Sequence, residues 1–123
     1  MLEEAIMIRR EEILVYVKEK YGVDPDYPWM RTPNYAILRH EHNRKWFGAI
    51  VDVSEKKLGL EGNRVVDAMN LKCDPLLIGS LKSEPGILPA WHMNKEHWIT
   101  VLLETVSPEK MYGLIDLSYA LTK

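Results

Sequence analysis

The chain has 123 residues, of which 46% are hydrophobic and 28% charged, so one core and a single domain over residues 1–123 are expected. The net charge of -2 argues against a general nucleic-acid binder, although a local basic patch depends on where the charges lie. One cysteine excludes an internal disulfide, and the lack of a long apolar run or signal-peptide block predicts a cytoplasmic protein without membrane contact.

The first predicted element is an amphipathic helix over residues 2–20. Its apolar positions recur at steps of three and four and are Leu2, Ile6, Ile13, Leu14 and Val17. Gly22 is expected to end the helix in a left-handed conformation. The charged run at residues 9–12 is interpreted as a solvated face. Two prolines exclude regular structure over residues 24–29, which we interpret as a connector.

A β-hairpin is predicted from residues 34–40 and 45–53, which are rich in β-branched and aromatic residues and are joined by a polar turn. Asn43 is the turn residue expected to take positive φ. The tip is locally basic, and its candidate contacts are Arg39, His40, Arg44 and Lys45. These side chains could contact phosphate groups, or they could form an ordinary solvated loop.

The second half of the chain supplies the remaining elements. After a loop, a third strand is predicted over residues 64–72, followed by a short helix over 75–82 that Asp74 caps. A second hairpin pairs the short segment 90–93 with a buried strand over 98–102. Its loop is expected to present His92, Asn94, Lys95 and His97 to solvent. A last helix follows Ser107, with a buried stripe made of Met111, Leu114, Ile115, Ser118 and Leu121.

The predicted fold class follows from the order of these elements, α-β-β-β-α-β-β-α. Short connections between neighbouring strands favour an antiparallel sheet. The expected architecture is therefore a two-layer α+β domain, with five antiparallel strands covered by helices on one face and open on the other.

The search for catalytic chemistry yields only weak signals. Cys73 precedes a helix start, where the helix dipole could lower the pKa of its thiol, and His92 or His97 could act as a base. The same three residues could instead form a small-molecule or zinc site, although their spacing matches no closed ligand set. We therefore predict no catalytic residue, no cofactor and no metal, and we do not expect an enzyme.

Several motifs resemble those of the MmcQ/YjbR family, whose members are described as DNA-binding proteins with a double-wing motif. The segments that carry the resemblance are Tyr27-Pro28-Trp29, residues 33–40, Lys45-Trp46-Phe47, residues 70–75 and His92-Met93-Asn94-Lys95-Glu96-His97-Trp98. The family implies a two-layer α+β fold similar to frataxin-like and secretion-chaperone-like domains. The residues that match its wing and motif positions are Arg39, His40, Lys45, Lys72, His92, Asn94, Lys95, His97 and Trp98.

Two functions from different classes follow. The first is weak binding of DNA through the two basic hairpin tips, which requires both tips to lie side by side on the sheet. The second is binding of a protein or peptide on the open sheet face, where the aromatic anchors would be Tyr27, Trp29, Trp46 and Trp91. A structural interpretation of the 94–98 motif also stands, in which Asn94 and His97 tie the hairpin to residues 72–74 while Trp98 fills the core.

Overall fold

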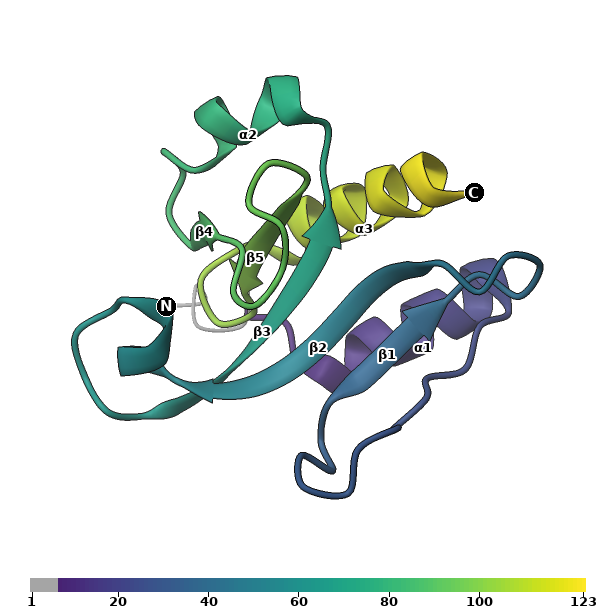
Figure 1. Cartoon of the computed structure of the whole chain (residues 1–123), viewed down its shortest axis with the longest axis horizontal. Helices are drawn as coiled ribbons and strands as arrows, with labels where there is room; N and C mark the ends of the chain where they lie inside the picture. Colours follow the sequence, from purple (N-terminus) through teal and green to yellow (C-terminus); the bar gives the residue numbers. More distant parts are fainter. Residues whose placement is uncertain (1–6) are drawn as a thin grey trace.

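The computed structural model describes residues 7–123, and Figure 1 shows a twisted sheet flanked by helices. The elements in chain order are α1 (Arg10–Tyr21), β1 (Ala36–Arg39), β2 (Trp46–Ser54), the 3-10 helix η2 (Glu55–Leu58), β3 (Val65–Lys72), α2 (Pro75–Leu81), β4 (Ile87–Pro89), β5 (Trp98–Leu102) and α3 (Pro108–Thr122). This order confirms the predicted α+β fold. None of the helices in the described range combines the length and apolar character that a membrane crossing requires.

The five strands pair in the order β1-β2-β3-β5-β4, and every pair is antiparallel. One row of aligned residues runs across all five strands and consists of Leu38, Gly48, Leu71, Ile99 and Pro89. Residues opposite one another on neighbouring strands point to the same face of the sheet, and successive residues along a strand point to alternate faces. The core face carries Met69 and Leu71 against α1 and α3, and the open face carries Ala68 and Asn70.

Helix α1 begins at Arg10, later than predicted, and the predicted residues 2–6 lie outside the described residues. Gly22 ends it with φ of 70°, which confirms the predicted left-handed cap. The charged run at its start is not a purely solvated face. The Arg10 guanidinium donates to both carboxylate oxygens of Asp67, at 3.0 and 3.2 Å, and so anchors α1 to β3.

Helix α3 lies against the core face, where it buries Met111, Leu114, Ile115 and Ser118 as predicted. The predicted fifth member of the stripe, Leu121, is 48% exposed, and Thr122 is buried instead. The Ser118 hydroxyl donates to the Phe47 carbonyl and accepts from the Lys72 amide. These bonds attach α3 to the start of β2 and the end of β3.

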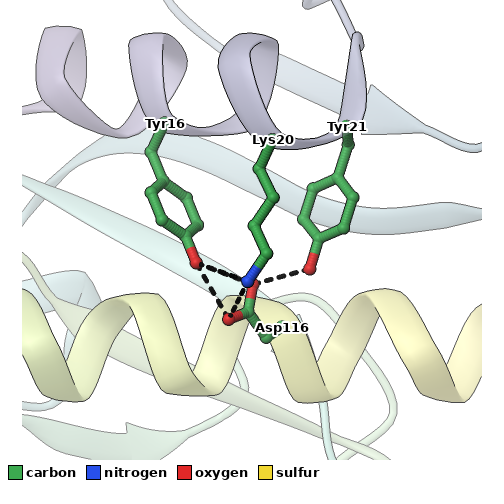
Figure 2. Close-up of polar contacts among 4 residues, drawn as sticks. All are labelled: Tyr16, Lys20, Tyr21 and Asp116. Carbon is green, nitrogen blue, oxygen red and sulfur yellow. Dashed lines mark hydrogen bonds and ion pairs between the residues drawn. The ribbon is translucent and has the colours of Figure 1, made fainter.

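A cluster of four polar side chains joins α1 to α3 on the outside of the helical layer (Figure 2). The carboxylate of Asp116 accepts hydrogen bonds from both tyrosines of α1 that reach it, Tyr16 at 2.8 Å and Tyr21 at 2.6 Å, and from Lys20 at 2.8 Å. Each tyrosine ring also stacks on a tyrosine of α3, with centroids 4.0 and 3.7 Å apart. The two helices are therefore held together by polar and aromatic contacts outside the core.

The β1–β2 hairpin forms as predicted, but Arg44 rather than Asn43 takes positive φ, at 61°. Asn43 instead uses its side chain. Its Oδ1 accepts from the Lys45 amide at 2.9 Å, and its Nδ2 donates to the Thr122 carbonyl at 3.1 Å. A bulge in the pairing next to Leu38 lets Phe47 turn to the core face, while Trp46 pairs with Arg39.

His40 is only 1% exposed, which places it beneath the surface at which a phosphate contact was predicted. Its Nε2 lies 2.8 Å from the Thr122 hydroxyl, and its ring packs against Phe47 and Tyr119. Burial lowers the pKa of His40, so the imidazole is neutral near pH 7. We therefore assign His40 to the core and exclude it from the candidate surface.

The burial of His40 predicts a pH dependence of stability. Because its pKa in the folded protein lies below the ordinary 6.5, the unfolded chain binds the proton first as the pH falls. The stabilisation is fully present above about pH 6.5 and is lost as the pH falls below that value toward the folded pKa. Urea unfolding at pH 8 and pH 5 should show a larger loss of stability for the native chain than for His40→Gln. Equal losses in the two proteins would contradict this prediction.

The second hairpin differs from its prediction in the first strand. That strand is Ile87–Pro89 rather than residues 90–93, and residues 90–97 form a loop. The reason is that the backbone of Trp91 bonds to side chains of neighbouring strands and not to a β ladder. Helix α2 starts as predicted, because the Asp74 carboxylate accepts from the Leu76 amide at 2.9 Å.

Candidate functional site

The two basic loops lie at the same end of the sheet. The turn 40–45 joins the end of β1 to the start of β2, and the loop 90–97 joins the end of β4 to the start of β5. In the antiparallel register, Arg39 is opposite Trp46 and Lys72 is opposite Trp98. These pairs mark one end of the strands, with the end of β3 between the two loops. We call this end of the sheet, together with both loops, the basic end.

The cations at the basic end differ in how far they are neutralised. Arg39 and Arg44 share the carboxylate of Asp26, at 2.8 and 3.5 Å. In contrast, Lys45, Lys72 and Lys95 have no acidic partner within 4.0 Å among the residues that the structure describes. The positive charge available to a ligand therefore comes mainly from the three lysines.

Cations and indole rings alternate along the basic end on the open face. The Arg39 guanidinium lies 5.6 Å from the ring centre of Trp46, and the Lys72 ammonium lies 5.6 Å from that of Trp98. Both are cation–π contacts at the usual distance. Trp98 is therefore half-buried on the open face beside Lys72, and the prediction that it fills the core is wrong.

A groove of about 290 Å³ opens on the open face next to this row. Its floor is formed by strand residues and its sides by aromatic residues of the connector and of the loop 90–97. The lining residues are Trp29, Thr32, Tyr35, Ile37, Trp46, Ala49, Val51, Asn70, Trp91, His92 and Met93. We call it the aromatic groove. Three of the four predicted anchors line it, and Tyr27 does not.

The connector reaches the groove because Asp26 forms an isolated bridge with Ile37 of β1, with backbone hydrogen bonds of 2.8 and 2.9 Å. This bridge lays the following residues along the edge of the sheet and brings Trp29 over the open face. Tyr35 was missed by the sequence analysis. Tyr35 lies two residues before Ile37 of β1. Because side chains along a strand alternate between faces, this spacing could have placed Tyr35 on the open face with Ile37.

A buried polar network holds the loop side of the groove. The Thr100 hydroxyl, which is fully buried, donates to the Asn70 side-chain oxygen at 2.5 Å and accepts from the Trp91 amide at 2.8 Å. The Asn70 side-chain nitrogen donates to the Trp91 carbonyl at 3.1 Å. Both backbone groups of Trp91 are thereby fixed by side chains of β3 and β5, and its ring position follows from them.

The backbone of His92 has a left-handed conformation, with φ of 60°, which residues other than glycine rarely adopt. Its ring stacks on Trp91, with centroids 3.9 Å apart and planes 11° apart. The imidazole is exposed at the rim of the groove, as predicted. The turn at this residue therefore lays the imidazole over the Trp91 ring and leaves the His92 side of the stack exposed.

The rest of the loop confirms part of the structural interpretation. The Asn94 side-chain oxygen accepts from the Glu96 amide at 2.7 Å, and the His97 carbonyl accepts from the Cys73 amide at 2.8 Å. Asn94 therefore shapes the turn, and the backbone of His97 ties it to the corner after β3. The side chains of Lys95 and His97 remain exposed.

Cys73 does not have the environment of a reactive thiol. It is 5% exposed, and burial raises its pKa, with a smaller contribution from the nearby Asp74 carboxylate. The alternative in which the helix start lowers this pKa does not hold, because desolvation dominates and Cys73 is a small buried side chain. Cys73, His92 and His97 also do not come together as a metal-binding group in the described part of the chain.

The family model described as YjbR matches residues 18–121. The chain belongs to the YjbR family. A Bacillus subtilis (strain 168) relative, uncharacterized protein YyaQ, is 52% identical over 118 residues, which cover 95% of this chain and 100% of the relative. The uncharacterized protein YjbR of Escherichia coli (strain K12) is 39% identical over 54 residues, covering 42% of this chain and 46% of the relative. The family resemblance in the sequence is thus confirmed.

Solved structures of relatives share the fold. A crystal structure of a Pseudomonas syringae protein matches with a TM-score of 0.92 at 44% identity, covering 94% of this YjbR chain and 100% of that one. A crystal structure of a Deinococcus radiodurans protein matches with a TM-score of 0.71 at 21% identity, covering 96% and 80% of the two chains. The second likeness concerns the fold alone.

Proposed function

We propose that this YjbR-family protein binds nucleic acid weakly through the basic end of its sheet. The observation that carries the proposal is the position of Lys45, Lys72 and Lys95, which come from three separate segments to one end of the sheet and have no acidic partner among residues 7–123. Lysines that hold no internal ion pair can contact phosphate without first breaking one.

The proposal agrees with the overall charge of the protein. A net charge of -2 leaves no general attraction to a polyanion, so binding must be local and few phosphates can be neutralised. Three lysines, with the partly neutralised Arg39 and Arg44 beside them, support micromolar or weaker affinity rather than tight binding. His97 is exposed on the same loop as Lys95, and its ring N–H can donate one further hydrogen bond to a phosphate.

A salt titration tests this proposal. The affinity of the native protein for a fluorescein-labelled oligonucleotide is measured by fluorescence anisotropy between about 20 and 200 mM salt, a range over which screening of charges changes strongly. The affinity should fall steeply as the salt concentration rises. The double variant Lys72→Gln, Lys95→Gln should bind more weakly and lower the slope of log K against log salt by about 1.5, because two phosphate contacts are lost.

The matched control is Lys56→Gln, Lys57→Gln, which removes the same charge from η2 at the opposite end of the sheet. These two lysines are exposed and should leave the slope unchanged. Equal losses from both double variants would show that only net charge matters. That result, or no binding at 20 mM salt, would refute a site at the basic end.

A further inference from the structure

We propose that the aromatic groove takes one unstacked base of a single-stranded nucleic acid, so that the protein prefers single strands to duplexes. This inference rests on the proposed function and deepens it. It assigns the phosphates to the lysines of the basic end and a base to the groove beside them.

The rings around the groove do not close it by stacking on one another. Trp29 contacts Trp46 and Tyr35 at centroid distances of 6.0 and 6.2 Å with interplanar angles of 62° and 89°, and Tyr35 contacts Trp91 at 6.3 Å and 82°. All three pairs are edge-to-face. The parallel stack in this region is Trp91 with His92, and the exposed His92 imidazole, which covers one face of Trp91, is the ring on which a base would stack. A nucleobase is a ring system of the same kind.

The volume of the groove suits a small planar group. About 290 Å³ lies at the lower limit of ligand pockets, which run from about 300 to 1,000 Å³. One base fits this space, whereas a helix or a bulky apolar side-chain cluster does not. The floor is low because Ala49 and Val51 of β2 are short, and the aromatic sides rise from the connector and the loop.

The floor also carries hydrogen-bonding capacity. The Asn70 amide uses one N–H toward the Trp91 carbonyl and one oxygen lone pair toward Thr100. A primary amide has two N–H donors and two lone pairs, so one of each remains. The edge of a base offers both donors and acceptors, and an aliphatic side chain offers neither. A polar floor under aromatic sides therefore favours a base over an apolar peptide.

One of the three lysines of the basic end lies about one nucleotide spacing from the groove. Lys72 follows Asn70 by two residues on the same face of β3, roughly 7 Å along the strand at the usual rise. A phosphate attached to a base in the groove can therefore contact Lys72 without distortion of the strand. Arg39, over Trp46 at the groove rim, is positioned to contact the next phosphate. Aromatic sides with cations at the rim are the combination that binds single strands.

The experiment compares three labelled probes of equal length with the native protein: a single-stranded oligothymidylate, the same backbone with every base removed, and a duplex. The oligothymidylate should bind at least about fivefold more tightly than the abasic strand, which is the lower limit for one base–aromatic stack. It should also quench tryptophan fluorescence, because three of the four tryptophans line the groove.

Two variants remove the rings at little risk to folding. Trp29→Ala changes a connector residue that is 40% exposed, and His92→Gly removes the stacked imidazole at a position with φ of 60°, which glycine adopts readily. Both should reduce the preference for bases and leave abasic binding unchanged. Tyr112→Leu removes a half-buried ring of the helical layer and should change neither.

The outcomes separate the two proposals. If the abasic strand and oligothymidylate bind equally and both need Lys72 and Lys95, the basic end binds phosphate and the groove inference is wrong. If no probe binds, both proposals fail. If the duplex binds more tightly than the single strand, the inference is overturned. It is also overturned if a neutral Phe-Ser repeat peptide quenches the fluorescence of the groove tryptophans while oligothymidylate does not, because the groove then binds another kind of partner.

Discussion

Replacing Thr100 by valine is expected to lower the free energy of unfolding by about 2–4 kcal/mol, because two buried polar groups lose their partner at once. Valine keeps the shape of threonine but has no hydroxyl. The Trp91 amide then has no acceptor, and one lone pair of Asn70 has no donor, in a region where Thr100 is fully buried. Each such group costs about 1–3 kcal/mol.

Urea unfolding followed by circular dichroism measures this effect, with Thr105→Val as control. Thr105 is exposed between β5 and α3, so the same chemical change should cost less than about 0.5 kcal/mol there. Thr100→Val should also weaken the preference for bases, since the backbone of Trp91 loses one of its two anchors. A stability change as small as that of the control would show that the network contributes little.

Replacing Asp116 by alanine is expected to lower the free energy of unfolding by about 2–3 kcal/mol, because Tyr16, Lys20 and Tyr21 lose their common partner (Figure 2). This loss is small for three hydrogen bonds to a charged group, because water screens the partly exposed side chains of Asp116 and Lys20, which are 33% and 48% exposed. Asp24→Ala is the control. It removes an exposed partner of Lys18 and should cost no more than about 0.5 kcal/mol.

The same cluster predicts how stability changes in acid. Burial alone would raise the pKa of Asp116, but hydrogen bonds from Lys20, Tyr21 and Tyr16 outweigh it and hold the pKa below the ordinary 3.8. The stabilisation is therefore present above about pH 4 and is lost as the pH falls through the folded pKa. Asp116→Asn should show a smaller loss of stability between pH 5 and pH 2.5 than the native chain. A steeper loss in the variant would contradict the assignment.

The strand and helix periods predicted most of the fold. The cap at Gly22 and four of the five stripe positions of α3 follow from local spacing alone, and the structure confirms them. His40 shows the limit of arguing from local charge. It was grouped with its cationic neighbours, whereas the period of two in β1 already places it on the same face as Ala36 and Leu38.

The candidate site depends on contacts that sequence spacing does not reveal. Asp26 lies thirteen residues before Arg39 in the chain and neutralises Arg39 and Arg44 only because the connector folds back to form a bridge with Ile37. The aromatic groove needs that same bridge and also the buried bonds that turn the loop 90–97 over β3. Local composition identified the aromatic residues, and long-range hydrogen bonds decide which of them meet.

The most direct test of the account is a nuclear magnetic resonance titration with oligothymidylate, following the indole N–H signals and the backbone amides together. The account predicts that the indole signals of Trp29, Trp46 and Trp91 shift with the amides of residues 92–97, while the amides of α1 and the exposed face of α3 stay unchanged. Shifts confined to the helical layer, or none at the tryptophans while the lysine end responds, would contradict a base-binding groove on the open face.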